Sequence, residues 1–392
     1  MPLLTRRRFL RHSAALTLAA SLPPGRPTAS AATSPAASPD RNFSFLLLGD
    51  LHFDRPEHHD LAWVQRDKPN DVRQIEGYCR NTREVTPQLL ATLRRTWDEL
   101  HRQPAARPAF VLQVGDLVEG LCGSEELAAR QNREAVEFVE GALPGRPFLF
   151  TKGNHDITGP GAGPAFGQVF HPYLTTQVRR LTPGAAEVTS ARFTVDCGRA
   201  QFVFFDAYEA AKSLEWLEAV AARRTAEHWF VVIHPPVVPY GARSTWHVFA
   251  SPKEQARREK LLALLGDQQA IVLGGHIHRY NRITRRAGRG RFTQFALSSV
   301  LTAPEVRPQT VLEGIDRYTP DQISVEPSFS PTNEAERRAV YVAERPAVTA
   351  FEYADLPGYA VVTVDGPQVL VRMCAGTGTT VWRTARLDAG AA

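Results

Sequence analysis

The chain has 392 residues, of which 43% are hydrophobic and 22% charged, a balance that fits a soluble globular protein and excludes a mostly disordered one. The net charge of +5 comes from residues 1–39, which hold five arginines and no acidic residue. The other 41 of the 46 basic residues balance the 41 acidic ones, so the rest of the chain has no general field to attract nucleic acid or anionic lipid.

The N-terminal residues have the order of an export signal. Residues 5–11 are basic, residues 14–22 are apolar, and residues 29–31 form a small-residue cleavage site. The arginine pair followed by Phe-Leu resembles the twin-arginine signal, a route for proteins that fold, often around a metal, before they cross the membrane. We expect a signal peptide over residues 1–31, a Pro/Ala/Ser-rich linker over 32–42, and a periplasmic or extracellular protein.

Strands and helices alternate after the linker. The expected strands are 43–48, 109–114, 147–151, 192–196, 201–206, 228–233, 270–273, 291–298, 359–364 and 368–373, the last two joined as a hairpin at Asp365-Gly366. The expected helices are 86–101, 125–142, 212–222 and 253–265, and the chain beyond 273 is expected to be all-β.

Two stretches, 54–83 and 303–337, show no regular pattern and are expected to be long irregular loops. We expect a catalytic core over 43–300 and a C-terminal part, 301–392, that completes or rims it. No apolar run reaches about 18 residues, so no membrane insertion is expected. The four cysteines are too few and too scattered for a disulfide framework or a cysteine-rich metal site, although one disulfide stays possible.

Five short polar clusters follow predicted strands. They are Gly49-Asp50-Leu51-His52, Gly115-Asp116-Leu117-Val118-Glu119, Gly153-Asn154-His155-Asp156, His234-Pro235-Pro236 and Gly274-Gly275-His276-Ile277-His278. Strand ends in α/β folds face a common crevice, so residues far apart in sequence can meet there. The oxygen and imidazole donors suit Mn, Fe or Zn. Two ions about 3.5–4 Å apart that share a carboxylate would use the whole set.

In this order, from Gly49 to His278, the clusters resemble the signature of the calcineurin-like metallophosphoesterases. The resemblance implies an α/β fold, a four-layer α/β/β/α sandwich of two mixed sheets flanked by helices, with two divalent or trivalent ions. It assigns Asp50, His52 and His278 to the first metal, Asp116 to the bridge, Asn154, His234 and His276 to the second metal, and His155 to catalysis without ligation.

Such a site would hydrolyse a phosphate ester with a metal-activated hydroxide, while His155 protonates the leaving group as general acid. Glu119 is our first choice as the carboxylate that orients His155, and Asp156 is the second, although Asp156 could equally cap a loop. Purple acid phosphatases have Tyr at the position of Glu119, and Ser/Thr protein phosphatases have Arg at the position of Gly120. The nearest likeness is therefore to exported bacterial phosphoesterases of broad type.

The leading hypothesis is an exported phosphohydrolase that acts on a small phosphomonoester or phosphodiester. A nucleotidase or nuclease would use the same site, and a non-catalytic binding scaffold is the third alternative; the neutral body argues against an extended nucleic-acid partner. Lys152 could contact phosphate or simply be solvated. Other candidates for substrate contact are Arg73, Tyr78, Arg80, Tyr240, Arg243, Trp246 and His247.

Overall fold

A computed structural model describes residues 42–103, 106–241, 247–322 and 334–388. The expected signal peptide and all of the linker except Asn42 lie outside these residues. Within them, no helix is both long enough and apolar enough to cross a membrane. The four cysteines are all described and form no disulfide.

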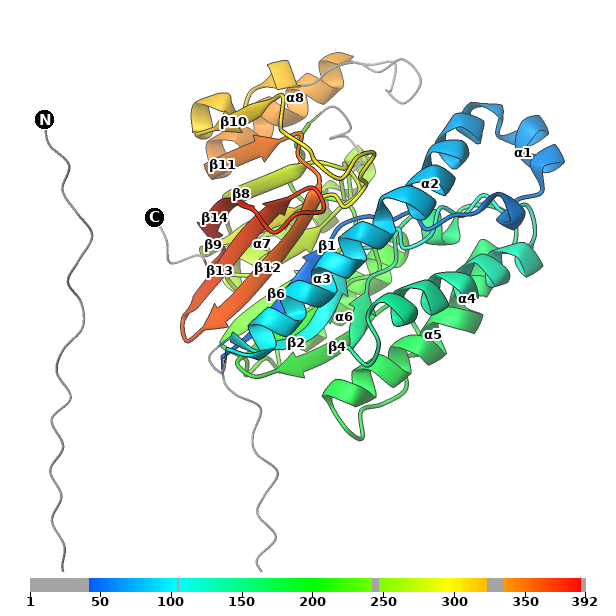
Figure 1. The fold of residues 1–392 in the computed structure, drawn as a ribbon. Helices are drawn as coiled ribbons and strands as arrows, with labels where there is room; N and C mark the ends of the chain where they lie inside the picture. The colour runs from blue at the N-terminus through cyan, green and yellow to red at the C-terminus, as the bar shows by residue number, and fades with distance from the viewer. Residues whose placement is uncertain (1–41, 104–105, 242–246, 323–333, 389–392) are drawn as a thin grey trace, which may run out of the picture. The chain divides into compact units, whose positions relative to one another are not determined.

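Two mixed β-sheets form the centre of the described fold (Figure 1). The first has the strand order β14-β13-β12-β1-β2-β3, and the second has the order β10-β11-β8-β9-β7-β6-β5-β4. The strands of the first sheet are β1 (Phe43–Leu48), β2 (Pro108–Gln113), β3 (Phe148–Phe150), β12 (Gly358–Asp365), β13 (Gln368–Ala375) and β14 (Val381–Arg386). Those of the second are β4 (Phe193–Cys197), β5 (Ala200–Phe204), β6 (His228–Val232), β7 (Ile271–Gly274), β8 (Tyr280–Ala287), β9 (Gly290–Ala296), β10 (Val311–Glu313) and β11 (Val348–Ala354).

Phenylalanines fill the space between the sheets. Phe45 stacks on Phe110 with ring centroids 5.3 Å apart, and both rings meet Phe202 of the other sheet edge-on, at 5.2 and 4.9 Å. Each ring buries a large apolar area, and edge-to-face pairs add about 0.5–1.5 kcal/mol each. The two sheets therefore pack face to face, as expected for the sandwich.

Helices cover the outer faces of both sheets, which gives the α/β/β/α order (Figure 1). Leucines and phenylalanines of α3 (Thr86–His101) and α5 (Ala162–Leu181) share one core with the first sheet, joined by α4 (Glu125–Ala142). Leucines of α6 (Ala210–Ala221) and α7 (Gln255–Asp267) share another core with the second sheet. The predictions for α3 and α4 agree with the observed bounds.

The expectation of an irregular loop over 54–83 is wrong. The segment holds helices α1 (Leu61–Asp67) and α2 (Val72–Glu84), with two short 3₁₀ turns at 56–58 and 69–71. The buried side of α2 consists of Ile75, Tyr78, Cys79, Asn81 and Thr82, so it mixes apolar and polar residues. Val72, Ile75 and Cys79 recur at helical spacing, so the segment does carry an amphipathic period, and the expectation of a loop overlooked it.

Two further expectations need correction. The chain beyond 273 is not all-β, because α8 (Glu334–Glu344) lies within it and begins inside the stretch expected to be irregular. Helix α5 was also not expected, because Pro172 and several glycines interrupt its pattern. The Asp365-Gly366 hairpin is confirmed by the antiparallel pairing of β12 with β13.

Candidate metal centre

The loops after β1 and β2 are joined by backbone hydrogen bonds. The amides of Leu51 and His52 both donate to the carbonyl of Asp116 at 3.0 Å, and Phe53 donates to Leu117 at 2.8 Å. Strands β1, β2 and β3 are parallel, as are β5, β6, β7 and β9, so their carboxyl ends carry the polar clusters to a common edge.

Four donors form a first group, which consists of Asp50, His52, Asp116 and His278. One ligand atom from each lies within 4.8 Å of the others. His278 Nε2 is 2.9 Å from Asp50 Oδ2, and His52 Nε2 is 3.1 Å from His278 Nε2 and 3.8 Å from Asp116 Oδ2. Two imidazole nitrogens that point at one another and at two carboxylates outline a cation site.

A second group adjoins the first through Asp116. It consists of Asp116, His234 and His276, with His234 Nε2 3.0 Å from Asp116 Oδ2 and 3.3 Å from His276 Nδ1. His234 Nδ1 is 2.8 Å from the carbonyl of Val114, so Nδ1–H donates there and Nε2 faces the group. Metal-binding histidines are commonly oriented in this way. Asp116 thus belongs to both groups, the position required of a bridging carboxylate.

The backbone at the candidate ligands is strained. The φ angles of His52, Asp116, His276 and His278 are 46°, 56°, 70° and 57°, and these are four of the seven non-glycine residues with positive φ among the residues described. Such conformations are uncommon for residues with a Cβ and concentrate at functional sites, where the surrounding structure enforces them.

Two glycines allow the backbone to approach the candidate carboxylates. A Cβ on Gly153 would lie 2.1 Å from Asp116 Oδ1, and a Cβ on Gly275 would lie 2.2 Å from Asp50 Oδ1. No side chain fits at either position without moving the carboxylate.

Glu119 lies between two histidines. Its Oε2 is 2.8 Å from His52 Nδ1 and 3.2 Å from His155 Nδ1, and its backbone carbonyl is 2.9 Å from His155 Nδ1. His155 Nδ1–H therefore has acceptors in both the side chain and the backbone of Glu119. The expected Glu119–His155 pairing corresponds to a contact in the structure, with the addition that Glu119 also holds His52.

Asp156, the second choice as partner of His155, contacts backbone amides instead. Its carboxylate accepts backbone N–H bonds from Asp116, Val118 and Gly153 at 3.1, 3.1 and 2.7 Å, and no hydrogen bond joins it to His155 among the residues described. These contacts are those of a loop cap, the alternative left open above. Asp156 thus fixes the backbone of the loops that carry Asp116 and Asn154.

The pKa values of the donors depend on burial and on the two carboxylates. Burial lowers the pKa of His52 and His276 well below the usual value, so both are neutral, as ligands must be. Burial also acts to lower the pKa of His234, but the charge and hydrogen bond of Asp116 outweigh it and raise that pKa to about 9. A cation between Asp116 and His234 would take the place of this proton.

The donor set fits a metal pair. Asn154 Oδ1 is buried and has no hydrogen-bond partner among the residues described, which costs about 1–3 kcal/mol unless another group satisfies it. The two carboxylates, one amide oxygen and four imidazoles contain no thiolate, a chemistry suited to Mn, Fe or Zn. With Asn154, the second group would have four protein donors, equal to the first.

The residues suggested for substrate contact have different locations. Arg73 and Arg80 are exposed on α2, whereas Tyr240 is fully buried and cannot meet a substrate in this structure. Lys152 is neither solvated nor free, because its Nζ lies 2.5 Å from Asp206 Oδ2 and over the ring of Tyr208. Arg243 and Trp246 lie outside the described residues.

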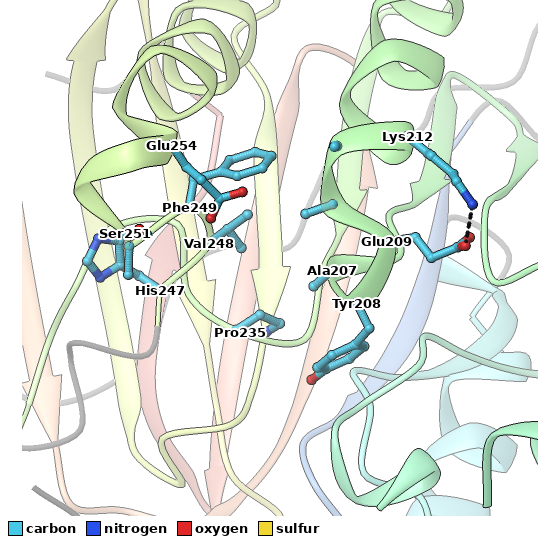
Figure 2. Close-up of a pocket in the computed structure, with 13 residues that line it drawn as sticks. Ala207, Tyr208, Glu209, Lys212, Pro235, His247, Val248, Phe249, Ser251 and Glu254 are labelled. Carbon is cyan, nitrogen blue, oxygen red and sulfur yellow. Dashed lines mark hydrogen bonds and ion pairs between the residues drawn. The ribbon is translucent and has the colours of Figure 1, made fainter. Parts of the chain in front are cut away.

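A cavity of about 670 Å³ opens next to the second donor group (Figure 2). Pro235, which directly follows His234, lines it together with Tyr208, His247 and Phe249. Figure 2 shows Tyr208 and Pro235 at one end and Phe249 and Glu254 at the other. Burial raises the pKa of Tyr208, and the charges of Asp116, Asp156 and Asp50 raise it further. Tyr208 was not among the sequence candidates, because it follows a strand without a polar cluster.

Comparison with known proteins supports the same interpretation. A model of the calcineurin-like phosphoesterase family matches residues 43–280. A purple acid phosphatase from yellow lupin (Lupinus luteus) has a similar structure with a TM-score of 0.50 and 12% identity, covering 91% of this chain and 55% of its own. A dimetal phosphatase from Danio rerio has a TM-score of 0.49 and 13% identity, covering 89% of this chain and 99% of its own. No curated protein matches the sequence.

Proposed function

The chain belongs to the calcineurin-like phosphoesterase family, and from this we propose that it is a metal-dependent phosphohydrolase that cleaves small phosphomonoesters or phosphodiesters. The observation that carries the proposal is the position of Asp116, whose carboxylate belongs to two adjoining donor groups. Family members use a dinuclear metal centre, and the two groups of this chain match that arrangement. We assign Asp50, His52 and His278 to one ion, Asn154, His234 and His276 to the other, and Asp116 to both.

Two bound ions would lower the pKa of a water molecule and neutralise charge on the phosphoryl oxygens. The protein's own contribution is to hold the donors in place before the ions arrive. Asp50 accepts the backbone N–H of His276 at 3.0 Å, and Asp116 accepts that of His155 at 2.8 Å. The loop that carries His276 thus orients the carboxylate of Asp50, and the loop that carries His155 orients that of Asp116.

His155 is proposed as the general acid. Its Nδ1–H is directed at Glu119, so the Nε2 atom remains to give a proton to the leaving oxygen. Burial acts to lower the pKa of His155, but the charges of Glu119 and Asp116 outweigh it and raise that pKa, which favours the protonated imidazole.

The cavity beside Pro235 is proposed to take the organic part of the ester. Its lining combines the aromatic rings of Tyr208 and Phe249 with polar groups such as Ser251 and Glu254. A mixed lining of this kind binds a small organic group by contact area and a few directed hydrogen bonds. Export by the twin-arginine route is part of the same proposal and rests on the order of residues 5–31.

The test compares p-nitrophenyl phosphate with bis-(p-nitrophenyl) phosphate, using protein loaded separately with Mn, Fe or Zn. Hydrolysis of at least one ester, with close to two ions per chain by metal analysis, is the expected result. A fully folded sample that binds two ions and cleaves neither ester would contradict the hydrolase. A sample that binds no ion after careful loading would contradict the ligand assignment.

A further inference from the structure

Helix α2, which lies in the segment expected to be an irregular loop, packs against the candidate metal centre. Two of its residues are tied to the loop that follows β1: Thr82 Oγ1 accepts the backbone N–H of Asp54 at 3.0 Å, and Cys79 Sγ lies 3.5 Å from Asp54 Oδ2. Asp54 is two residues beyond His52, so the helix is fixed to the same loop as a candidate ligand.

Nearer its start, α2 contacts Glu119. Gln74 Nε2 donates to Glu119 Oε1 at 2.7 Å, while the other oxygen, Oε2, faces the Nδ1 atoms of His52 and His155. The carboxylate of Glu119 is fully buried and has N–H groups on both sides. Of these three donors, Gln74 alone holds Oε1 and so determines the rotation of the carboxylate about its last bond.

Tyr78, four residues after Gln74, contacts His52, one of the two histidines that face Glu119. Its ring stacks on the imidazole of His52 with centroids 4.2 Å apart and an angle of 3° between the planes. Residues four apart lie on one face of a helix, so Gln74 and Tyr78 approach the site together. Stacking on Tyr78 fixes the plane of the His52 imidazole, and the contact with Glu119 fixes the direction of its Nδ1–H bond.

We propose that Gln74 and Tyr78 are positioning residues of the metal centre: Gln74 orients Glu119 for both His52 and His155, and Tyr78 orients His52 alone. This inference rests on the proposed function for its catalytic part, and on the ligand assignment for its metal-binding part. Neither residue is an assigned metal ligand or the proposed general acid. Replacing Gln74 is therefore expected to change both the affinity for metal and proton donation by His155. Replacing Tyr78 is expected to change mainly the affinity for metal.

Three variants distinguish the role of Gln74 from that of Tyr78. Gln74→Leu removes the donor at similar size, and Tyr78→Leu removes the stacked ring but leaves Gln74 and Glu119 intact. Glu76→Gln changes an exposed residue on the same helix and is the matched control. If Gln74→Leu does not fold, Gln74→Asn keeps the amide on a shorter side chain that does not reach Glu119. Thermal unfolding of each variant identifies any general loss of stability.

The first measurement is the affinity for Mn²⁺ by titration calorimetry, which needs no turnover. Partners of metal-bound histidines typically change affinity or activity by about 10–100-fold, so both Gln74→Leu and Tyr78→Leu are expected to bind Mn²⁺ about tenfold more weakly than wild type. Glu76→Gln is expected to bind as wild type does. Wild-type affinity in both site variants would overturn the inference.

The second measurement is the ratio of kcat for p-nitrophenyl and phenyl esters. Gln74→Leu is expected to lose about tenfold more activity on the phenyl ester, because poor leaving groups depend on the proton from His155. Tyr78→Leu is expected to lose activity equally on both esters. An unchanged ratio in Gln74→Leu would show that Gln74 does not act through His155.

The two proposals fail in different ways. A wild-type protein that binds two ions but hydrolyses no ester would contradict the proposed function, while the Mn²⁺ affinities would still decide the positioning role. An active wild type with Gln74→Leu equal to it in Mn²⁺ affinity and in ester ratio would contradict the inference alone.

Discussion

His234 Nε2 lies 3.0 Å from Asp116 Oδ2, and this contact joins the two sheets at their functional edge. Asp116 follows β2 of the first sheet, whereas His234 follows β6 of the second. The other proposed ligands are divided in the same way, with Asp50, His52 and Asn154 on the first sheet and His276 and His278 on the second. Ions held by these residues would therefore link the two sheets.

Replacing Asp116 with Asn should abolish hydrolysis. The substitution removes the charge shared by both donor groups, and the ions supply several kcal/mol of transition-state stabilisation, so kcat should fall at least about a hundredfold. Metal analysis should show fewer than two ions per chain. Asp98→Asn, at a side chain that is 57% exposed, is the control and should behave as wild type. An Asp116→Asn protein with full activity would contradict the bridging role.

Replacing His155 with Ala should affect esters according to their leaving group. General acids contribute about 10²–10⁴-fold, and that contribution is largest when the leaving oxygen is a strong base. Phenyl and alkyl esters should therefore lose far more activity than p-nitrophenyl esters, with metal content unchanged. Equal losses on all esters would exclude proton donation by His155.

Replacing Asn154 with Leu should have opposite effects on stability and on metal binding. The buried Oδ1 has no partner, so its removal should stabilise the metal-free protein by about 1 kcal/mol. The same change removes a proposed ligand and should eliminate the stabilisation that saturating Mn²⁺ gives to the wild type. Urea unfolding with and without Mn²⁺ measures both. Destabilisation of the metal-free variant would mean that Oδ1 is satisfied within the protein.

Stability should depend on the ionisation of Glu344 in acid. Burial acts to raise its pKa, but Arg258 and Arg285 outweigh burial and lower that pKa below the usual 4.5. The ionised group therefore stabilises the fold above pH 4.5, and this contribution is lost as the pH falls through the lowered value. Glu344→Gln should cost about 3–5 kcal/mol at pH 7, because it leaves buried arginine charge unpaired.

Urea unfolding from pH 7 to pH 3 tests this expectation, and the difference between Glu344→Gln and wild type should shrink as the pH falls. Asp316→Asn is the control, because the Asp316 side chain is 98% exposed and its ion pair with Arg345 should contribute less than about 1 kcal/mol. A difference that does not change with pH would show that packing, and not charge, makes Glu344 important.

The sequence was most informative where chemistry and strand ends coincide. Each polar cluster follows a buried strand, so the sequence could predict that Asp50 and His278 lie close together, although they follow strands of different sheets. Gln74 could not be found in this way, because it lies within a helix and does not follow a strand. The role of Asp156 could not be decided from the sequence, because a carboxylate next to His155 can either contact the imidazole or accept hydrogen bonds from backbone amides. The structure shows the second arrangement.

The pairing of β1 with β12 has a consequence for biosynthesis. Strand β1 is among the first described residues to be made, yet its antiparallel partner ends at Asp365. Until those residues have left the ribosome, Phe43–Leu48 has an unpaired edge, and the loop that carries Asp50 lacks one side of its support. Strand β1 therefore gains its second neighbour only after β12 has been made. A secretion system that accepts finished, folded cargo would suit this order of events.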